Sequence, residues 1–217
     1  MTFSQNTTFL PTGATAFFRR RLIELCGLGL FVGAVLYAAA LVTFSADDPS
    51  FNNVSTAATT NILGPVGAHL ADLSLQFIGA ASALVVLTLA AWAWRLTIHR
   101  GLRFGWIHIA LLPFAAVLAA GAMSGLTPIV QWGIAAGVGG VAGLLIQSGL
   151  AGTGTLIGLG ANGWLAPLVL GLLAMPISLF ALGLSSHEWQ SIFSRARWTG
   201  VFVARSGLWT IGRLRGA

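Results

Sequence analysis

The stretch SADDPSFNNVSTAATTNILGPVGAHLADLSLQFIG, residues 45–79, decides the fold because it lies between two long apolar runs. It contains three of the five acidic residues of the chain, Asp47, Asp48 and Asp72, and none of the arginines. Pro49 and Pro65 oppose regular helix at the ends of its polar half, since proline lacks an N–H donor and restricts the residue before it. Residues 45–67 are therefore predicted to form a loop between two membrane-spanning helices.

The composition places the chain among membrane proteins. Of its 217 residues, 56% are hydrophobic and 7% are charged, whereas charged residues make up about a quarter of an ordinary soluble domain. The mean hydropathy is +0.87, and several apolar runs approach or exceed twenty residues. These features predict an all-α membrane protein that crosses the bilayer several times.

The charges give the topology. The net charge is +6, and all eleven basic residues are arginine. A phosphate-binding loop of the GxxxxGK[ST] type requires a lysine, so a loop of this type is excluded. The arginines cluster beside the apolar runs and are absent from residues 45–67, which places both termini in the cytoplasm and the loop outside. The predicted topology anchors are Arg19, Arg20, Arg21, Arg95, Arg100, Arg103, Arg195 and Arg197.

The spans follow from the apolar runs. A membrane domain over residues 19–187 is predicted to contain four transmembrane helices, at about 22–44, 68–94, 105–123 and 164–184. The glycine-rich segment between the third and fourth spans predicts a short re-entrant or interfacial helix near residues 134–150, on the outer side, because lipid does not tolerate irregular backbone. Six crossings is the alternative.

The two ends of the chain differ from this domain. Residues 1–18 are predicted to be a disordered cytoplasmic tail, because they are polar and rich in threonine. Residues 188–217 mix tryptophan with arginine and are predicted to lie in the inner headgroup layer.

Ionisable side chains inside membrane segments are candidate functional sites. His69 and Asp72 share a helix face near the outer end of the second span, where we interpret them as hydrogen-bonding groups of structural importance. Asp72→Leu is expected to weaken packing against the segment near residues 134–150. His108 is expected to donate a bond between helices. No arrangement of residues suggests catalysis, a cofactor or a metal ion, so the chain is predicted to be no enzyme.

Three further features of the first span have structural interpretations. Glu24 lies within one turn of Arg21 and is expected to form an ion pair at the interface. Gly29 and Gly33 form a GxxxG step, a weak signal for a close helix neighbour. Cys26 is interpreted as a small apolar side chain, without a disulfide or metal role.

Motifs spread over about residues 19–189 resemble the N-terminal four-helix membrane domain of FtsK/SpoIIIE-family DNA translocases. They are the DPS sequence at 48–50, the NILGPVGAHLAD sequence at 61–72, the GGVAG sequence at 139–143 and the LSSHEW sequence at 184–189. The residues that carry this resemblance are Asp48, Pro49, Ser50, Gly64, Gly67, Ala68, Asp72, Gly79, Gly139, Gly140 and Gly143.

The resemblance implies a membrane anchor of a cell-division DNA translocase, in the bacterial inner membrane at the division septum. Such an anchor would support divisome assembly and chromosome segregation, with the lipid bilayer and other cell-division membrane proteins as partners. A second copy of the chain, in a homo-oligomer, is a further candidate partner. In the family a linker joins this domain to a hexameric ATPase that moves DNA. No residue of this chain is expected to bind nucleotide or nucleic acid. The chain is therefore expected to be either a fragment of a longer protein or a separate membrane module.

Two other functions are alternatives. A small channel or transporter could use the glycine-rich residues 124–163 as a path, although transport sites usually carry polar groups near the bilayer centre. The other alternative is a membrane scaffold subunit unrelated to cell division.

Overall fold

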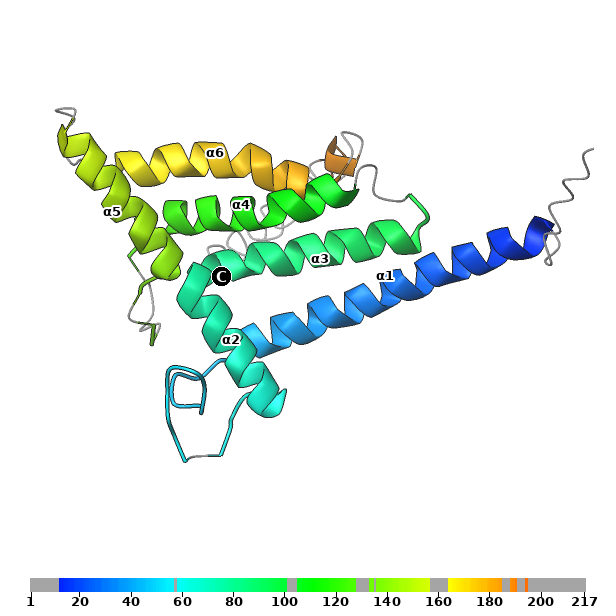
Figure 1. The fold of residues 1–217 in the computed structure, drawn as a ribbon, viewed down its shortest axis with the longest axis horizontal. Coiled ribbons are helices and arrows are strands. Elements are labelled where there is room, and N and C mark those ends of the chain that lie inside the picture. The colour runs from blue at the N-terminus through cyan, green and yellow to red at the C-terminus, as the bar shows by residue number, and fades with distance from the viewer. Residues whose placement is uncertain are drawn as a thin grey trace, which may run out of the picture. The chain divides into compact units, whose positions relative to one another are not determined.

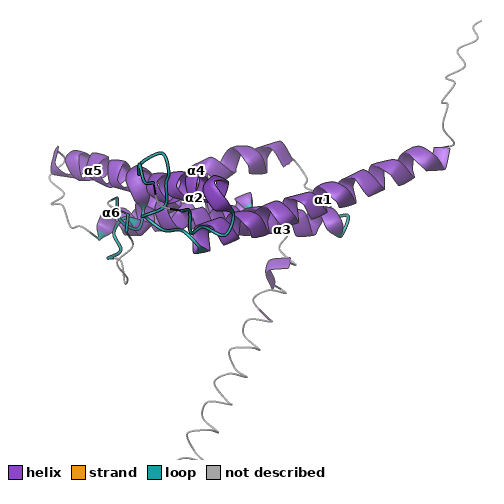
Figure 2. Ribbon diagram, turned by 90° about the horizontal axis from the view of Figure 1, so that it is seen from below, coloured by secondary structure: helices purple, strands orange, loops and turns teal. Residues whose placement is uncertain are grey.

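The computed structural model describes residues 12–56, 58–100, 105–127, 133–134, 136–156, 164–184, 188–190 and 194. In these residues the secondary structure is helical, with loops and turns between the helices (Figure 2). The elements are α1 (Thr12–Val42), α2 (Gly64–Ile78), the 3₁₀ helix η1 (Gly79–Ala81), α3 (Ser82–Thr97), α4 (Gly105–Met123), α5 (Gly140–Leu156) and α6 (Leu165–Ala181).

The lengths and composition of the helices fit a membrane domain. Among the described residues, three helical stretches are long and apolar enough to cross a bilayer, Gly13–Val42, Gly64–Thr97 and Gly105–Met123. Two shorter apolar helices, Gly140–Leu150 and Leu165–Ala181, accompany them. The prediction of an all-helical membrane domain is confirmed at this level.

The long helices form two antiparallel pairs. α1 packs along α3, and α4 packs along α6, while α3 and α4 touch more sparingly (Figure 1). We call the end with residues 43–63, α2 and α5 the loop end (Figure 1). The opposite end, where the arginines of α1 and α3 lie, is the arginine end.

The beginning of α1 and the path of the second span differ from the sequence-based expectation. α1 begins at Thr12, inside the predicted tail of residues 1–18. The run expected as one span at 68–94 is bent at η1, so that α2 turns steeply away from α3 (Figure 1). Gly79 makes the bend possible, because its φ of 59° lies in the left-handed region that glycine adopts without steric cost.

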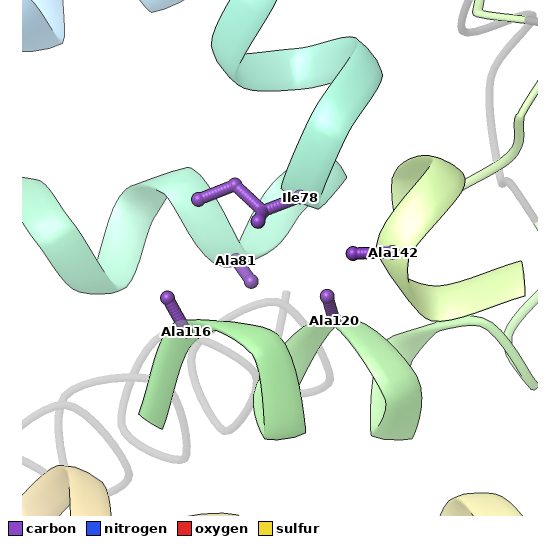
Figure 3. Packing of buried hydrophobic residues seen from close by; sticks show 5 residues of the cluster. All are labelled: Ile78, Ala81, Ala116, Ala120 and Ala142. Atoms are coloured by element: carbon purple, nitrogen blue, oxygen red, sulfur yellow. The ribbon is translucent and has the colours of Figure 1, made fainter. Parts of the chain in front are cut away.

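The core beside this bend is built from small side chains. Ile78 and Ala81 contact Ala116 and Ala120 of α4 and Ala142 of α5 (Figure 3). Ala81 and Ala120 are fully buried. Small residues let helix backbones approach closely. In lipid, where the hydrophobic effect contributes little to helix association, this close packing is the main source of stability. This core fixes α2, α4 and α5 at the loop end.

The chain divides into two units, residues 1–183 and residues 184–217. The predicted interfacial segment 188–217 falls mostly outside the described residues. Helix is described at residues 188–190 and 194.

Candidate functional site

Asp48 is the centre of the polar loop between α1 and α2. Its carboxylate accepts hydrogen bonds from the Thr60 backbone N–H at 2.7 Å, the Thr60 hydroxyl at 2.8 Å and the Asn61 N–H at 3.0 Å. Burial raises the pKa of the Asp48 carboxyl, but these three bonds outweigh burial and hold the pKa below its ordinary value. Asp48 therefore joins the start of the loop to its end as a charged side chain.

Asn61 connects this loop to the end of α1. Its Nδ2 donates to the carbonyl oxygens of Ala40 at 2.9 Å and Thr43 at 3.2 Å, and its Oδ1 accepts from the Leu63 N–H. The last carbonyls of a helix lack partners within the helix, so Asn61 satisfies part of that need. A Cβ on Gly67 would lie 2.2 Å from Asn61 Oδ1, which explains the glycine.

Asp72 ties α2 to the same loop. Its carboxylate accepts from Asn52 Nδ2 at 3.1 Å and Gln76 Nε2 at 2.6 Å, and the side chain is buried. His69 instead bonds through Nδ1 to the Pro65 carbonyl of its own helix. The hydrogen bonds of Asp72 thus run to the loop and within α2, while α2 as a helix also packs against α5. The expected effect of Asp72→Leu on packing against the segment near residues 134–150 stays a prediction.

The other loop residues singled out by the resemblance support this arrangement. The Ser50 hydroxyl accepts a hydrogen bond from the Asn52 N–H at 3.4 Å, and the Ser50 N–H donates to the Asn53 carbonyl. Pro49 is half-buried beside Asp48, and Ala68 is buried. Gly64 opens α2 with a φ of 64°.

Gly79 and Gly140 mark a close crossing of two backbones. A Cβ on Gly79 would lie 2.0 Å from the Val138 carbonyl oxygen, and one on Gly140 would lie 2.7 Å from the Gly79 nitrogen. The Val138 carbonyl accepts from the Ala80 N–H at 2.8 Å. Only glycine fits both positions, since Gly140 also has a positive φ of 63°.

Gly139 and Gly143 admit α4 against the start of α5. A Cβ would lie 2.2 Å from the Ala120 carbonyl oxygen at Gly139 and 2.5 Å from it at Gly143. The glycines of the resemblance at 79, 139, 140 and 143 thus lie at the contacts beside this core, Gly139 and Gly143 against Ala120 and Gly79 against Gly140. They determine how α2, α4 and α5 meet.

The described topology anchors lie at the arginine end. Arg19, Arg20 and Arg21 are in α1, Arg95 is in the last turn of α3, and Arg100 follows α3. Arg103, Arg195 and Arg197 lie outside the described residues.

Glu24 joins α1 to the residues that follow α3. Its carboxylate contacts Arg21 at 2.5 Å, which confirms the expected ion pair, and also His99 Nε2 at 2.8 Å. Gly27 is the glycine at which α1 approaches α3, because a Cβ there would lie 3.0 Å from Leu96. The GxxxG step gives no such approach, since space within 4 Å of a Cβ on Gly29 or Gly33 is empty.

Two long-range bonds hold the end of α6. His108 Nδ1 donates to the Phe180 carbonyl at 2.9 Å, which confirms its expected bond between helices. Trp92 Nε1 donates to the Ala181 carbonyl at 3.0 Å. Trp92 is not among the residues singled out from the sequence. The signal that could have found it is its two-residue spacing from Trp94, which puts the two side chains on different sides of the helix, so that Trp92 is buried while Trp94 is exposed.

These contacts describe a structural site. In the described part of the chain, no group of three or more histidine, cysteine, aspartate or glutamate side chains could hold a metal ion. The carboxylates of Asp48 and Asp72 are occupied by amide and hydroxyl donors of the loop and of α2. The arrangement can hold a loop and a bent helix in a defined position at one end of the bundle.

Comparison with known proteins shows which family the sequence of this chain is similar to. Residues 19–197 match the family described as the 4TM region of DNA translocase FtsK/SpoIIIE. The DNA translocase FtsK of Bradyrhizobium diazoefficiens is 39% identical over 140 residues, which cover 62% of this chain and 16% of that protein.

Two further relatives carry the same name. The DNA translocase FtsK of Mesorhizobium japonicum is 34% identical over 79% of this chain and 19% of its own length. That of Azospirillum brasilense is 29% identical over 94% of this chain and 32% of its own length. The chain thus spans less than a third of the length of these relatives. No solved structure matches it.

Proposed function

The chain belongs to the family of FtsK/SpoIIIE 4TM regions, and from this premise we propose that it is the membrane anchor of a cell-division DNA translocase. The match covers the membrane region of that family and not its ATPase motor. The anchor is therefore non-catalytic, and its role is to place the translocase in the inner membrane at the division septum. There it contacts other cell-division membrane proteins and supports chromosome segregation.

The observation that carries this proposal is the gathering of the described arginines at one end of the α1–α3 pair, beside which α4 and α6 form a second antiparallel pair. At this end Glu24 joins α1 to His99, just after α3, and His108 joins the start of α4 to the end of α6. α1, α3, α4 and α6 are four crossings in this proposal, and α5 is the interfacial helix. The arginine end faces the cytoplasm by the positive-inside rule.

A cysteine-labelling experiment tests this topology. In a Cys26→Ala background, Val54→Cys in the loop and Ile98→Cys at the arginine end are exposed positions. A membrane-impermeant maleimide is expected to label Val54→Cys in intact spheroplasts and Ile98→Cys after permeabilisation. Labelling of Ile98→Cys in intact spheroplasts would reverse the proposed orientation.

The septal role is tested separately with a fluorescent fusion of the protein in dividing cells. The signal is expected to gather at midcell during constriction. A uniform membrane signal in cells that are dividing would contradict the septal role while leaving the topology intact.

A further inference from the structure

The helical path through α2, η1 and α3 is too long for a single straight crossing. It contains 34 residues and would extend about 51 Å at the rise of a regular helix, against a hydrocarbon thickness of about 30 Å. α3 alone, with 16 residues, covers about 24 Å. α3 with η1 therefore accounts for most of the crossing, and α2 must be placed elsewhere.

The backbone at Gly79 determines where α2 goes. The 59° φ of Gly79 and the bond from the Ala80 N–H to the Val138 carbonyl turn the chain between the two helices. α2 and α5 both lie steeply inclined to α3, α4 and α6 at the loop end (Figure 1). α2 packs against α5 and the end of α1, which holds it in this direction.

One face of α2 is apolar and exposed. The face begins with Ile62 just before the helix, at 70% exposure, and continues with Val66 at 77%, Leu70 at 42%, Leu73 at 55% and Phe77 at 54%. Their spacing of four, four, three and four residues puts them in one line along the helix. We call this line the α2 stripe.

The other side of α2 has its partners inside the chain. Gly67, Ala68, Ala71, Asp72, Leu75 and Ile78 are buried. The polar side chains beside the stripe also bond locally, His69 to the Pro65 carbonyl and Ser74 to the Leu70 carbonyl. The stripe is the part of α2 that the described residues of the chain leave exposed.

We propose that α2 lies in the plane of the membrane, with the α2 stripe inserted among the acyl chains of the leaflet at the loop end. The stripe ends at Phe77, two residues before the crossing begins, so it continues the lipid-facing surface of the spanning helices. An apolar line of this size would be unfavourable in water. A helix of this kind inserts its apolar face below the headgroups and leaves its polar edge in the interface. This placement rests on the proposed function in one respect, that α3 crosses the bilayer.

Depth measurements with spin labels test the placement. Single cysteines at Val66, Leu70, Leu73 and Phe77 in the Cys26→Ala background are labelled with a nitroxide, and the protein is reconstituted in phosphatidylethanolamine and phosphatidylglycerol vesicles. Collision rates with oxygen, which enters the bilayer, and with a water-soluble nickel complex give the depth of each label. Labels at Ala83, Leu87 and Trp94, exposed positions of α3, are the matched controls.

The four α2 labels are expected at nearly one shallow depth, about 5–10 Å below the headgroup boundary. A depth that rises along the helix by about 16 Å from Val66 to Phe77 would show that α2 continues the crossing, and would overturn the proposal. Free access of nickel to all four labels would place the stripe in water. Low access of both reagents would place it against protein. Both results would overturn the proposal.

The control labels separate this proposal from the proposed function. If α3 crosses the bilayer, its labels pass through a depth maximum between Ala83 and Trp94, whatever α2 does. Absence of that maximum would contradict the crossing by α3 itself.

Discussion

At the scale of single residues, Asp48 gives the loop a pH-dependent connection. Its three bonds hold the pKa of the folded state below the ordinary value of 3.8, so the carboxylate stabilises the fold above that pH. This contribution is lost as the pH falls through the lowered pKa. Unfolding in detergent, followed from neutral pH to well below pH 3.8, is expected to show this loss.

Asp48→Asn is expected to remove this part of the pH dependence and to lower the unfolding free energy at neutral pH by about 1–3 kcal/mol, because an amide nitrogen cannot accept the bonds. Asp47→Asn is the matched control, since Asp47 is exposed. Equal unfolding free energies of the two variants, with the same pH dependence, would contradict the role of Asp48.

Gly79 is a second residue with a measurable effect. Gly79→Ala is expected to lower the free energy of unfolding by about 1–2 kcal/mol, because alanine is strained in a left-handed backbone conformation. The loss is expected to be larger still because the new Cβ meets the Val138 carbonyl. Gly33→Ala is its control, in open space within α1, and is expected to be neutral or to stabilise by about 0.5–1 kcal/mol. Thermal unfolding in detergent compares them. Equal melting temperatures would show that the bend at Gly79 is absent in solution.

At the scale of elements, the end of α6 depends on donors from α3 and α4. Trp92→Phe keeps the aromatic packing and removes the donor to the Ala181 carbonyl, so a loss of about 1 kcal/mol is expected. Trp94→Phe provides the comparison, because Trp94 is 63% exposed. Hydrogen exchange of the last turn of α6 is the direct readout, and faster exchange is expected in Trp92→Phe and not in Trp94→Phe.

At the scale of the whole molecule, the pairing of α1 with α3 can be tested by cross-linking. Gly27→Cys with Leu96→Cys, in the Cys26→Ala background, is expected to form a disulfide on mild oxidation. A Cβ on Gly27 lies 3.0 Å from that of Leu96, near the separation of about 3.5–4.5 Å that disulfides require. Gly29→Cys with Leu96→Cys should stay reduced, because Gly29 faces away from α3. Equal cross-linking of both pairs would contradict the pairing.

The helices themselves were largely predictable. The third span was expected at 105–123, where α4 lies, and the segment near 134–150 overlaps α5. Apolar runs and their flanking arginines carry this information because lipid selects for length and composition. The role of Trp92 was missed, since its partner Ala181 lies 89 residues away in the sequence.

The sequence by itself determined that this is a helical membrane domain, and its motifs at 48–50, 61–72 and 139–143 pointed to the family. The tertiary structure decided why those motif residues are needed. Asp48 and Asn61 hold a loop whose partners are far apart in sequence, and Gly79 meets Gly140 across a backbone crossing. A glycine within an apolar run is compatible with a straight helix. The Val138 carbonyl approaches the backbone at Gly79, and there the helical path bends. The bend leaves the α2 stripe exposed.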